Sequence, residues 1–155
     1  MSSENRTRIQ ELMASSGVRF GTSGARGLVA DMSDEVCYAY TAAFLQAVSA
    51  SKGSVALAMD LRPSSPRIAA ACAAAIKAAG LRVDWCGAIP TPALALYAQT
   101  QPIPAVMITG SHIPFDRNGI KFYSASGEIT KADETAIADA VVVVPKHGLL
   151  AELPP

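Results

Sequence analysis

The sequence predicts an α/β domain, a mostly parallel sheet with helices on both faces, and two observations support this. Short apolar runs alternate with longer segments of helical periodicity along the 155 residues. Such alternation is typical of strand–helix–strand units, whose crossover helices cover the sheet. Half of the residues are apolar and only 6% are aromatic, which suits small side chains packed closely between helices and a sheet.

Capping residues and periodicity mark the expected helices. Ser33 is an N-cap candidate, and Ser65 is expected as the cap of a helix that has Pro66 at its first position and ends at Gly80. Thr130 begins a segment with the spacing of a capping box. The expected helices cover residues 4–13, 34–50, 66–79, 92–99 and 131–140.

Short apolar runs between these helices are the expected strands. They cover residues 55–59, 81–86, 105–108 and 120–123. Residues 20–30 contain several glycines and are expected as a loop with a short extended piece at its end. The pair Asn118-Gly119 is expected to form a turn that brings Lys121 back toward Ser111.

Composition and charge exclude several classes of protein. The chain has 13 basic and 13 acidic residues and no basic run, so we expect neither nucleic acid nor a membrane surface as a partner. No apolar run approaches the roughly 18 residues that span a bilayer, and the first residues lack the apolar part of a signal peptide. The three cysteines, Cys37, Cys72 and Cys86, are expected as reduced, buried thiols of a cytoplasmic protein.

The segment from Thr109 to Pro114 is the leading candidate for chemistry. It follows directly on the expected strand 105–108, and ligands of open α/β sheets bind beyond the carboxyl ends of the strands. Ser111 is therefore the candidate reactive hydroxyl, although the tripeptide alone would favour an ordinary polar turn. A serine hydrolase is disfavoured, because a nucleophile elbow needs glycine where Ile113 stands.

Three further segments carry glycine, proline or charge near expected strand ends. In residues 20–27 the glycines permit close approach of a ligand and Arg26 suits phosphate, the alternative being a turn with a solvated arginine. Residues 60–65 precede a helix start and either bind an anion or are braced by an Asp60–Arg62 pair, with the serine as the cap. Residues 87–92 are expected to have a structural role, because their prolines stiffen the path into a helix.

Taken together, these segments resemble the first domain of the α-D-phosphohexomutases, the family of phosphomannomutase and phosphoglucomutase. The family's Phe-Gly-Thr-Ser-Gly-x-Arg-Gly, Asp-x-Arg-x-Ser-Ser-type, Gly-x-x-Pro-Thr-Pro, Thr-x-Ser-His-x-Pro and Asn-Gly-x-Lys motifs are matched at residues 20–27, 60–65, 87–92, 109–114 and 118–121. Ile113 stands where the family commonly has Asn, and Gly110 where Ala is commoner. The resemblance implies a three-layer α/β/α sandwich with a four-stranded mixed sheet, strand order 2-1-3-4 and an antiparallel last strand.

The resemblance also implies an activity: reversible transfer of phosphate between C1 and C6 of a hexose phosphate through a phosphoserine and a bisphosphorylated sugar. By the match, Ser111 is the phosphorylated serine. Arg26 and Lys121 are the cations beside the phosphoryl group, and either could assist proton transfer. His112 braces the loop or donates to a phosphoryl oxygen. Hexose phosphates and hexose bisphosphates are the implied partners, and mannose, glucose or both remain open as the sugar.

Magnesium is the implied cofactor, bound here only through the phosphate on Ser111, with its carboxylate ligands in a second domain. The family has further domains, and their metal loop and recognition loops are not found in this sequence. We therefore expect a helical extension over residues 1–19, the first domain over 20–144 and a linker over 145–155 toward a missing second domain. The isolated chain is expected to be inactive. The alternative is a free-standing phosphosugar-binding or regulatory module without catalysis.

Overall fold

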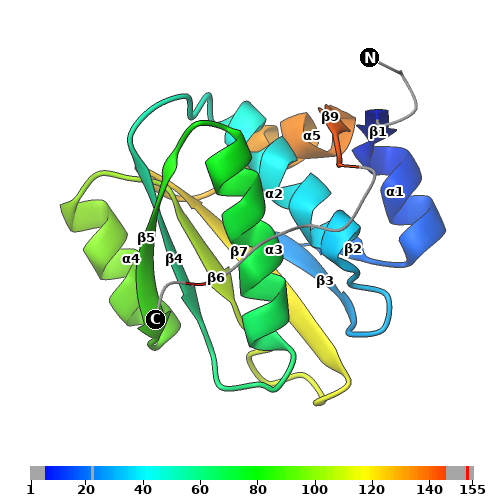
Figure 1. Cartoon of the computed structure of the whole chain (residues 1–155), viewed down its shortest axis with the longest axis horizontal. Coiled ribbons are helices and arrows are strands. Elements are labelled where there is room, and N and C mark those ends of the chain that lie inside the picture. The colour runs from blue at the N-terminus through cyan, green and yellow to red at the C-terminus, as the bar shows by residue number, and fades with distance from the viewer. Residues whose placement is uncertain (1–5, 22, 146–152, 154–155) are drawn as a thin grey trace.

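Strands and helices alternate along the residues that the computed structural model describes, which are 6–21, 23–145 and 153 (Figure 1). The strands of the main sheet are β2 (Arg19–Gly21), β3 (Gly24–Leu28), β4 (Ser54–Met59), β5 (Arg82–Ala88), β6 (Ala105–Ile108), β7 (Arg117–Ser124) and β8 (Gly127–Glu128). The helices are α1 (Ile9–Ser16), α2 (Asp34–Ala47), α3 (Ser65–Ala78), α4 (Thr91–Thr100) and α5 (Lys131–Asp139). A separate antiparallel pair joins β1 (Arg6–Arg8) to β9 (Val141–Val143).

The main sheet has the strand order β2-β3-β7-β6-β4-β5, with β8 paired to β7. β4 pairs in parallel with β5 and β6, whereas β7 runs antiparallel to both β6 and β3. The expected order of the four predicted strands, 2-1-3-4 with the last antiparallel, is confirmed. The expected number of four strands is too low for this seven-stranded sheet, because residues 20–30 were expected as a loop and instead contribute β2 and β3, and β8 adds a further short strand. The expectation of a mostly parallel sheet was wrong, since only the pairings of β4 are parallel.

Glycine is needed in this hairpin for close packing of strands. The glycines therefore belong to strands, although the sequence predicted a loop. A Cβ on Gly24 would lie 2.0 Å from the carbonyl oxygen of Ile120 on β7. A Cβ on Gly27 would lie 3.0 Å from Cγ2 of Val18. No side chain fits at the first position, so β3 approaches β7 as closely as it does only because glycine stands there.

Helices cover both faces of the sheet, in unequal numbers (Figure 1). α1, α2, α3 and α5 contribute to one core, in which Phe44 stacks on Phe122 of the sheet with ring centroids 4.6 Å apart. Of the helices in the described part of the chain, only α4 packs on the other face, where Leu94 and Met107 belong to a second core. The expected three-layer α/β/α sandwich is therefore confirmed. None of the helices that the structure describes is long and apolar enough to cross a membrane.

Two of the three expected helix caps are present. Ser33 caps α2 through its side chain, and Thr130 forms a capping box with Asp133 at the start of α5. The third prediction was wrong by one residue, since Ser64 is the N-cap residue of α3 and Ser65 is its first helical residue. The Ser65 hydroxyl donates to the Asp60 carboxylate and accepts from Asn118, and it does not cap the helix.

The N-terminal segment packs on the same core as the rest of the domain. Ile9 and Val18 are fully buried in that core, and Gly17 ends α1 in the left-handed conformation, with φ 76°. Residues 6–8, expected as helix, form β1 instead, because they pair with β9 at the far end of the chain. The divisions after residues 19 and 144 stay predictions, and the expected linker lies almost entirely outside the described residues.

All three cysteines are free thiols. Cys37 and Cys72 are buried as expected, whereas Cys86 on the edge strand β5 is only half-buried. Burial raises the pKa of the Cys72 thiol to about 12, so this thiol stays protonated and unreactive at neutral pH.

Candidate functional site

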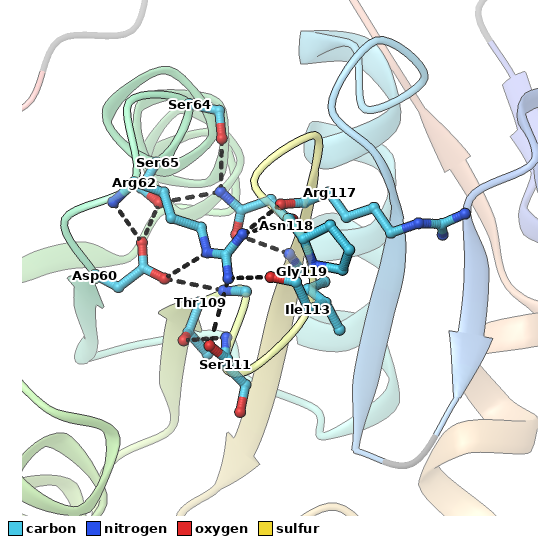
Figure 2. Close-up of polar contacts among 12 residues, drawn as sticks. Asp60, Arg62, Ser64, Ser65, Thr109, Ser111, Ile113, Arg117, Asn118 and Gly119 are labelled. Carbon is cyan, nitrogen blue, oxygen red and sulfur yellow. Dashed lines mark hydrogen bonds and ion pairs between the residues drawn. The ribbon is translucent and has the colours of Figure 1, made fainter.

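Residues 60–65 and the Ser111 loop lie against each other at the carboxyl ends of β4 and β6 (Figure 2). The Asp60 N–H donates to the Ile108 carbonyl at 2.8 Å. The Asp60 carboxylate accepts the N–H of Gly110 at 2.9 Å. Two segments that are distant in sequence are thus joined by hydrogen bonds at the edge of the sheet where ligands of α/β proteins bind.

Ser111 is exposed in the turn that follows β6, next to an exposed His112. The Ser111 backbone lies in the left-handed region, with φ 53°, and its N–H donates to Thr109 Oγ1 at 3.0 Å. Residues other than glycine seldom adopt this conformation, and such strain is concentrated at functional sites. In Figure 2 the Ser111 side chain points away from the Asp60–Arg62 pair.

Strand register brings Arg26 and Lys121 to one face of the sheet. Arg26 on β3 lies opposite Gly119 on β7, and Lys121 lies opposite Gly24. Opposed residues of an antiparallel pair project to the same face, as do residues two apart on one strand. Lys121 also lies opposite Met107, which belongs to the core under α4. Both cations therefore project from the α4 face, Arg26 exposed and Lys121 half-buried.

The Ser111 loop begins beside these two cations. The Thr109 N–H donates to the carbonyl of Gly119 at 3.0 Å, and Gly119 is the residue that pairs with Arg26. Lys121 is two residues further along the same strand. Ser111, Arg26 and Lys121 therefore come from three neighbouring elements, although their catalytic roles stay predictions.

Asn118 and Gly119 do not form the expected turn. Both lie within β7, and the chain reverses direction earlier, over residues 111–116. Asn118 is fully buried, and its Nδ2 donates to Ser64 Oγ at 2.8 Å and to Ser65 Oγ at 3.0 Å. Hydrogen bonds to the start of α3 satisfy the buried amide, so a residue pair typical of exposed turns is held inside the sheet.

The Asp60–Arg62 pair of the bracing alternative is present, although Ser65 is not the helix cap. Arg62 Nε lies 3.4 Å from Asp60 Oδ2, and the Asp60 carboxylate also accepts the Arg62 N–H and the Ser65 hydroxyl. Burial alone would raise the pKa of Asp60, but hydrogen bonds from Ser65, Gly110, Arg62 and Thr109 outweigh it and lower that pKa below its ordinary value. Asp60 is thus a charged anchor of the loops.

We expect Asp60→Asn to make the free energy of unfolding depend less on pH at acidic pH. A carboxyl whose pKa is lowered on folding stabilises the fold above its unfolded pKa, near 3.8 for Asp60, and loses this contribution as pH falls through the lowered folded pKa. At neutral pH the unfolding free energy of wild type should therefore be larger than that of the variant. Below about pH 4 the wild type should lose more of its unfolding free energy than the variant does. Urea unfolding across this range measures both effects. Asp116→Asn, at an exposed carboxylate of the neighbouring Ser111 loop, is the control, and identical profiles for Asp60→Asn and wild type would contradict the prediction.

The structural role expected for residues 87–92 agrees with the structure. Pro90 is the N-cap residue of α4, and its carbonyl accepts the N–H groups of Ala93 and Leu94 at 3.0 and 3.2 Å. Gly87 has a φ of 73°, which glycine adopts without strain. This segment ends β5 and starts a helix.

Glu134 supports the glycine-rich hairpin, and the sequence motifs did not predict this role. The Ser23 N–H donates to Glu134 Oε1 at 3.1 Å, across 111 residues of sequence. Ser23 is itself buried with a positive φ of 65°. Helix α5 therefore holds the turn that precedes Arg26, and no local pattern in either segment signals this contact.

The residues that the structure describes do not form a metal site by themselves. Among them, no group of three or more His, Cys, Asp or Glu side chains could hold a metal ion. The Asp60 carboxylate already accepts hydrogen bonds from the loops. The magnesium ion that the resemblance implies does not fit these residues alone.

Fold and site together define an α/β/α domain with a serine-bearing loop at the carboxyl edge of a mixed sheet. Residues 17–143 match the family model for phosphoglucomutase/phosphomannomutase, alpha/beta/alpha domain I. The chain therefore belongs to the phosphoglucomutase/phosphomannomutase family, as the sequence motifs predicted.

Named relatives agree with this assignment. The chain is 53% identical over 140 residues to a phosphomannomutase of Salmonella muenchen and 49% identical over 126 residues to a phosphomannomutase of Sinorhizobium fredii. These matches cover 88% and 78% of this chain but only 29% and 27% of the relatives. A solved phosphoglucomutase/phosphomannomutase family protein from Burkholderia thailandensis has a TM-score of 0.67 at 26% identity, covering 75% of this chain and 28% of that one. The chain thus spans less than a third of the length of these proteins.

Proposed function

We propose that this chain is the first domain of a phosphomannomutase- or phosphoglucomutase-type isomerase, acting on hexose phosphates as part of a longer enzyme. The observation that carries the proposal is the placement of Ser111, exposed and at positive φ, on a loop that starts beside the strands bearing Arg26 and Lys121. Membership of the family supports it. Relatives that are about half identical to the chain are named phosphomannomutases, which favours a mannose phosphate among the substrates.

In the proposed reaction Ser111 Oγ carries a phosphoryl group in the resting enzyme. The free hydroxyl of the sugar phosphate attacks this phosphorus, loses its proton and becomes a phosphate ester, while the bond to Ser111 Oγ breaks. The bisphosphorylated sugar then returns its other phosphoryl group to Ser111, which moves phosphate between C1 and C6. A strained, exposed loop suits a residue that must meet the sugar twice, once as donor and once as acceptor.

Positioning and charge stabilisation are what the protein must supply, because phosphoryl transfer passes through a loose transition state with charge spread over oxygen. We assign that stabilisation to Arg26 and Lys121, either of which could help to move the hydroxyl proton. The exposed His112 is proposed to donate to a phosphoryl oxygen. Magnesium, as a proposed cofactor, would neutralise phosphate charge, bound through the Ser111 phosphate and by carboxylates outside this chain.

The proposed compartment is the cytoplasm. Its support is the presence of three cysteines that are all free, with the buried Cys72 thiol protonated. Reduced thiols are typical of proteins kept in a reducing environment.

The isolated chain should show no mutase turnover, and this tests the proposal. Residues 1–155 and the full-length protein are assayed with mannose 1-phosphate or glucose 1-phosphate, Mg²⁺ and a hexose bisphosphate. The full-length protein should turn over, whereas the isolated domain lacks the other groups that would hold and turn the intermediate. Intact-mass analysis of the full-length protein should find a phosphate on Ser111. Turnover by the isolated chain would contradict the proposal that catalysis needs groups outside residues 1–155. An active enzyme that is never phosphorylated on Ser111 would contradict the proposed nucleophile.

A further inference from the structure

We propose that Arg62 is a positioning residue whose guanidinium clamps residues 111–117 from inside and so sets where the Ser111 hydroxyl stands. The inference rests on the proposed role of Ser111 and extends it to a residue that does not touch the substrate. Arg62 lies on the segment that follows β4, whereas Ser111 lies on the loop that follows β6. The Arg62 side chain is only 10% exposed, so its contacts are with protein.

The guanidinium donates to backbone carbonyls on both sides of the turn (Figure 2). The acceptors are the carbonyls of Ser111 at 3.4 Å, Ile113 at 2.5 Å, Pro114 at 2.7 Å and Arg117 at 3.1 Å. These bonds hold the turn at its beginning, middle and end. Because Ser111 is itself one of the acceptors, a shift of Arg62 shifts the backbone that carries the proposed nucleophile.

Asp60 fixes the orientation of this clamp. Its carboxylate lies 3.4 Å from Arg62 Nε and at the same time accepts the Gly110 N–H at 2.9 Å. The guanidinium also lies over the Phe115 ring, with the ring centroid 5.2 Å from Arg62 Cζ, a favourable cation–π distance. The guanidinium is therefore held by a carboxylate and by an aromatic ring of the loop that it organises.

In this conformation the guanidinium fills the space beside Gly110. A Cβ on Gly110 would lie 2.0 Å from Arg62 Nε and 2.1 Å from Arg62 Cζ. The Ile113 position contributes its carbonyl to the clamp rather than its side chain. The two departures from the family motif, Gly110 and Ile113, are thus compatible with the clamp.

These contacts distinguish Arg62 from a residue that binds phosphate directly. Both Nη1 and Nη2 donate to two carbonyls each, and Nε faces the Asp60 carboxylate. The guanidinium therefore has its donors engaged within the protein. A lysine could not replace it, since an ammonium cannot reach carbonyls spread over such a fork.

The test compares Arg62→Met and Arg62→Lys with Arg67→Met in the full-length enzyme. Arg67 is a matched control on α3, because its guanidinium also bonds a carbonyl, of Met32, and a carboxylate, of Asp34, each at 2.9 Å. Misplacing a reacting group by about 1 Å can cost roughly 10²-fold in rate. Both Arg62 variants should therefore lose about 10²-fold in kcat with little change in the KM for the sugar phosphate. Phosphorylation of Ser111 by a hexose bisphosphate should slow by a similar factor, while Arg67→Met keeps the wild-type kcat.

Rates are expressed per folded enzyme, with the folded fraction taken from thermal melting. If an Arg62 variant does not fold, Asp60→Asn takes its place, since it removes the carboxylate that orients the guanidinium and should also lower kcat. Wild-type kcat in the folded Arg62 variants, or in Asp60→Asn when it is used, would overturn the clamp. A kcat loss equal to that of Arg67→Met would overturn it as well. A wild-type enzyme whose turnover does not depend on Ser111 would instead overturn the proposed function, so the two failures are distinguishable.

Discussion

Ser111→Ala in the full-length enzyme should abolish mutase turnover, because the other hydroxyl of this loop, on Thr109, is engaged by Asp60 and by the N–H of residue 111 and should not replace it as the phosphoryl carrier. Loss of a single electrostatic donor typically costs about 10²–10³-fold in rate. Loss of the covalent carrier removes both half-reactions and should cost far more. The Ser111 side chain is exposed and points away from the clamp, so the fold should remain intact.

A coupled assay of mutase turnover, together with a thermal melt, measures this effect. Ser126→Ala, at an exposed serine of the turn after β7, is the control and should keep full activity. An alanine variant at position 111 that retained even a tenth of the wild-type rate would rule out the phosphoserine mechanism.

Arg26→Ala and Lys121→Met should each lower kcat by about 10- to 100-fold without lowering thermal stability. Each removes a charge-assisted hydrogen bond to phosphoryl oxygen, worth about 1.5–3 kcal/mol. Arg26 is exposed and Lys121 half-buried at the part of the sheet next to the Ser111 loop. Neither side chain belongs to the buried cores of the described residues, so its removal should leave packing unchanged.

Steady-state rates and melting curves of both variants test this prediction. Arg82→Ala is the matched control, since Arg82 is an exposed cation at the start of the edge strand β5. If the two cations were ordinary solvated charges, all three variants would have wild-type kinetics. That result would remove Arg26 and Lys121 from the proposed mechanism and leave Ser111 untouched.

Elements with a strong local signal could be predicted closely. The run Ala105–Ile108 was predicted with its observed bounds, because a short apolar run between proline and glycine residues has few other conformations. α2 and α5 were predicted because Ser33 and Thr130 supply hydrogen bonds that start a helix. The β2–β3 hairpin was missed because its stability comes from β7, a partner that local sequence does not reveal.

The candidate site shows the same division between local and distant information. Residues at single positions, such as Ser111, could be proposed from motifs, and register then places Arg26 and Lys121 on one face. The reach of Arg62 could not be predicted, because its acceptors lie 49 to 55 residues further along the chain. Asn118 was misassigned for a related reason, since its side-chain partners are at the start of α3, 53 and 54 residues away.

The pairing of β1 with β9 has a consequence for how the chain is made. Arg6 pairs with Val143, and Gln10 donates to Asp139 at 2.8 Å across 129 residues of sequence. Ribosomes add roughly 5–20 residues per second, and nascent domains fold as they emerge. β1 must therefore wait, without its partner β9, while the residues between the two strands are synthesised. Closing this long loop is slow, so β1 is made long before it can reach its final place.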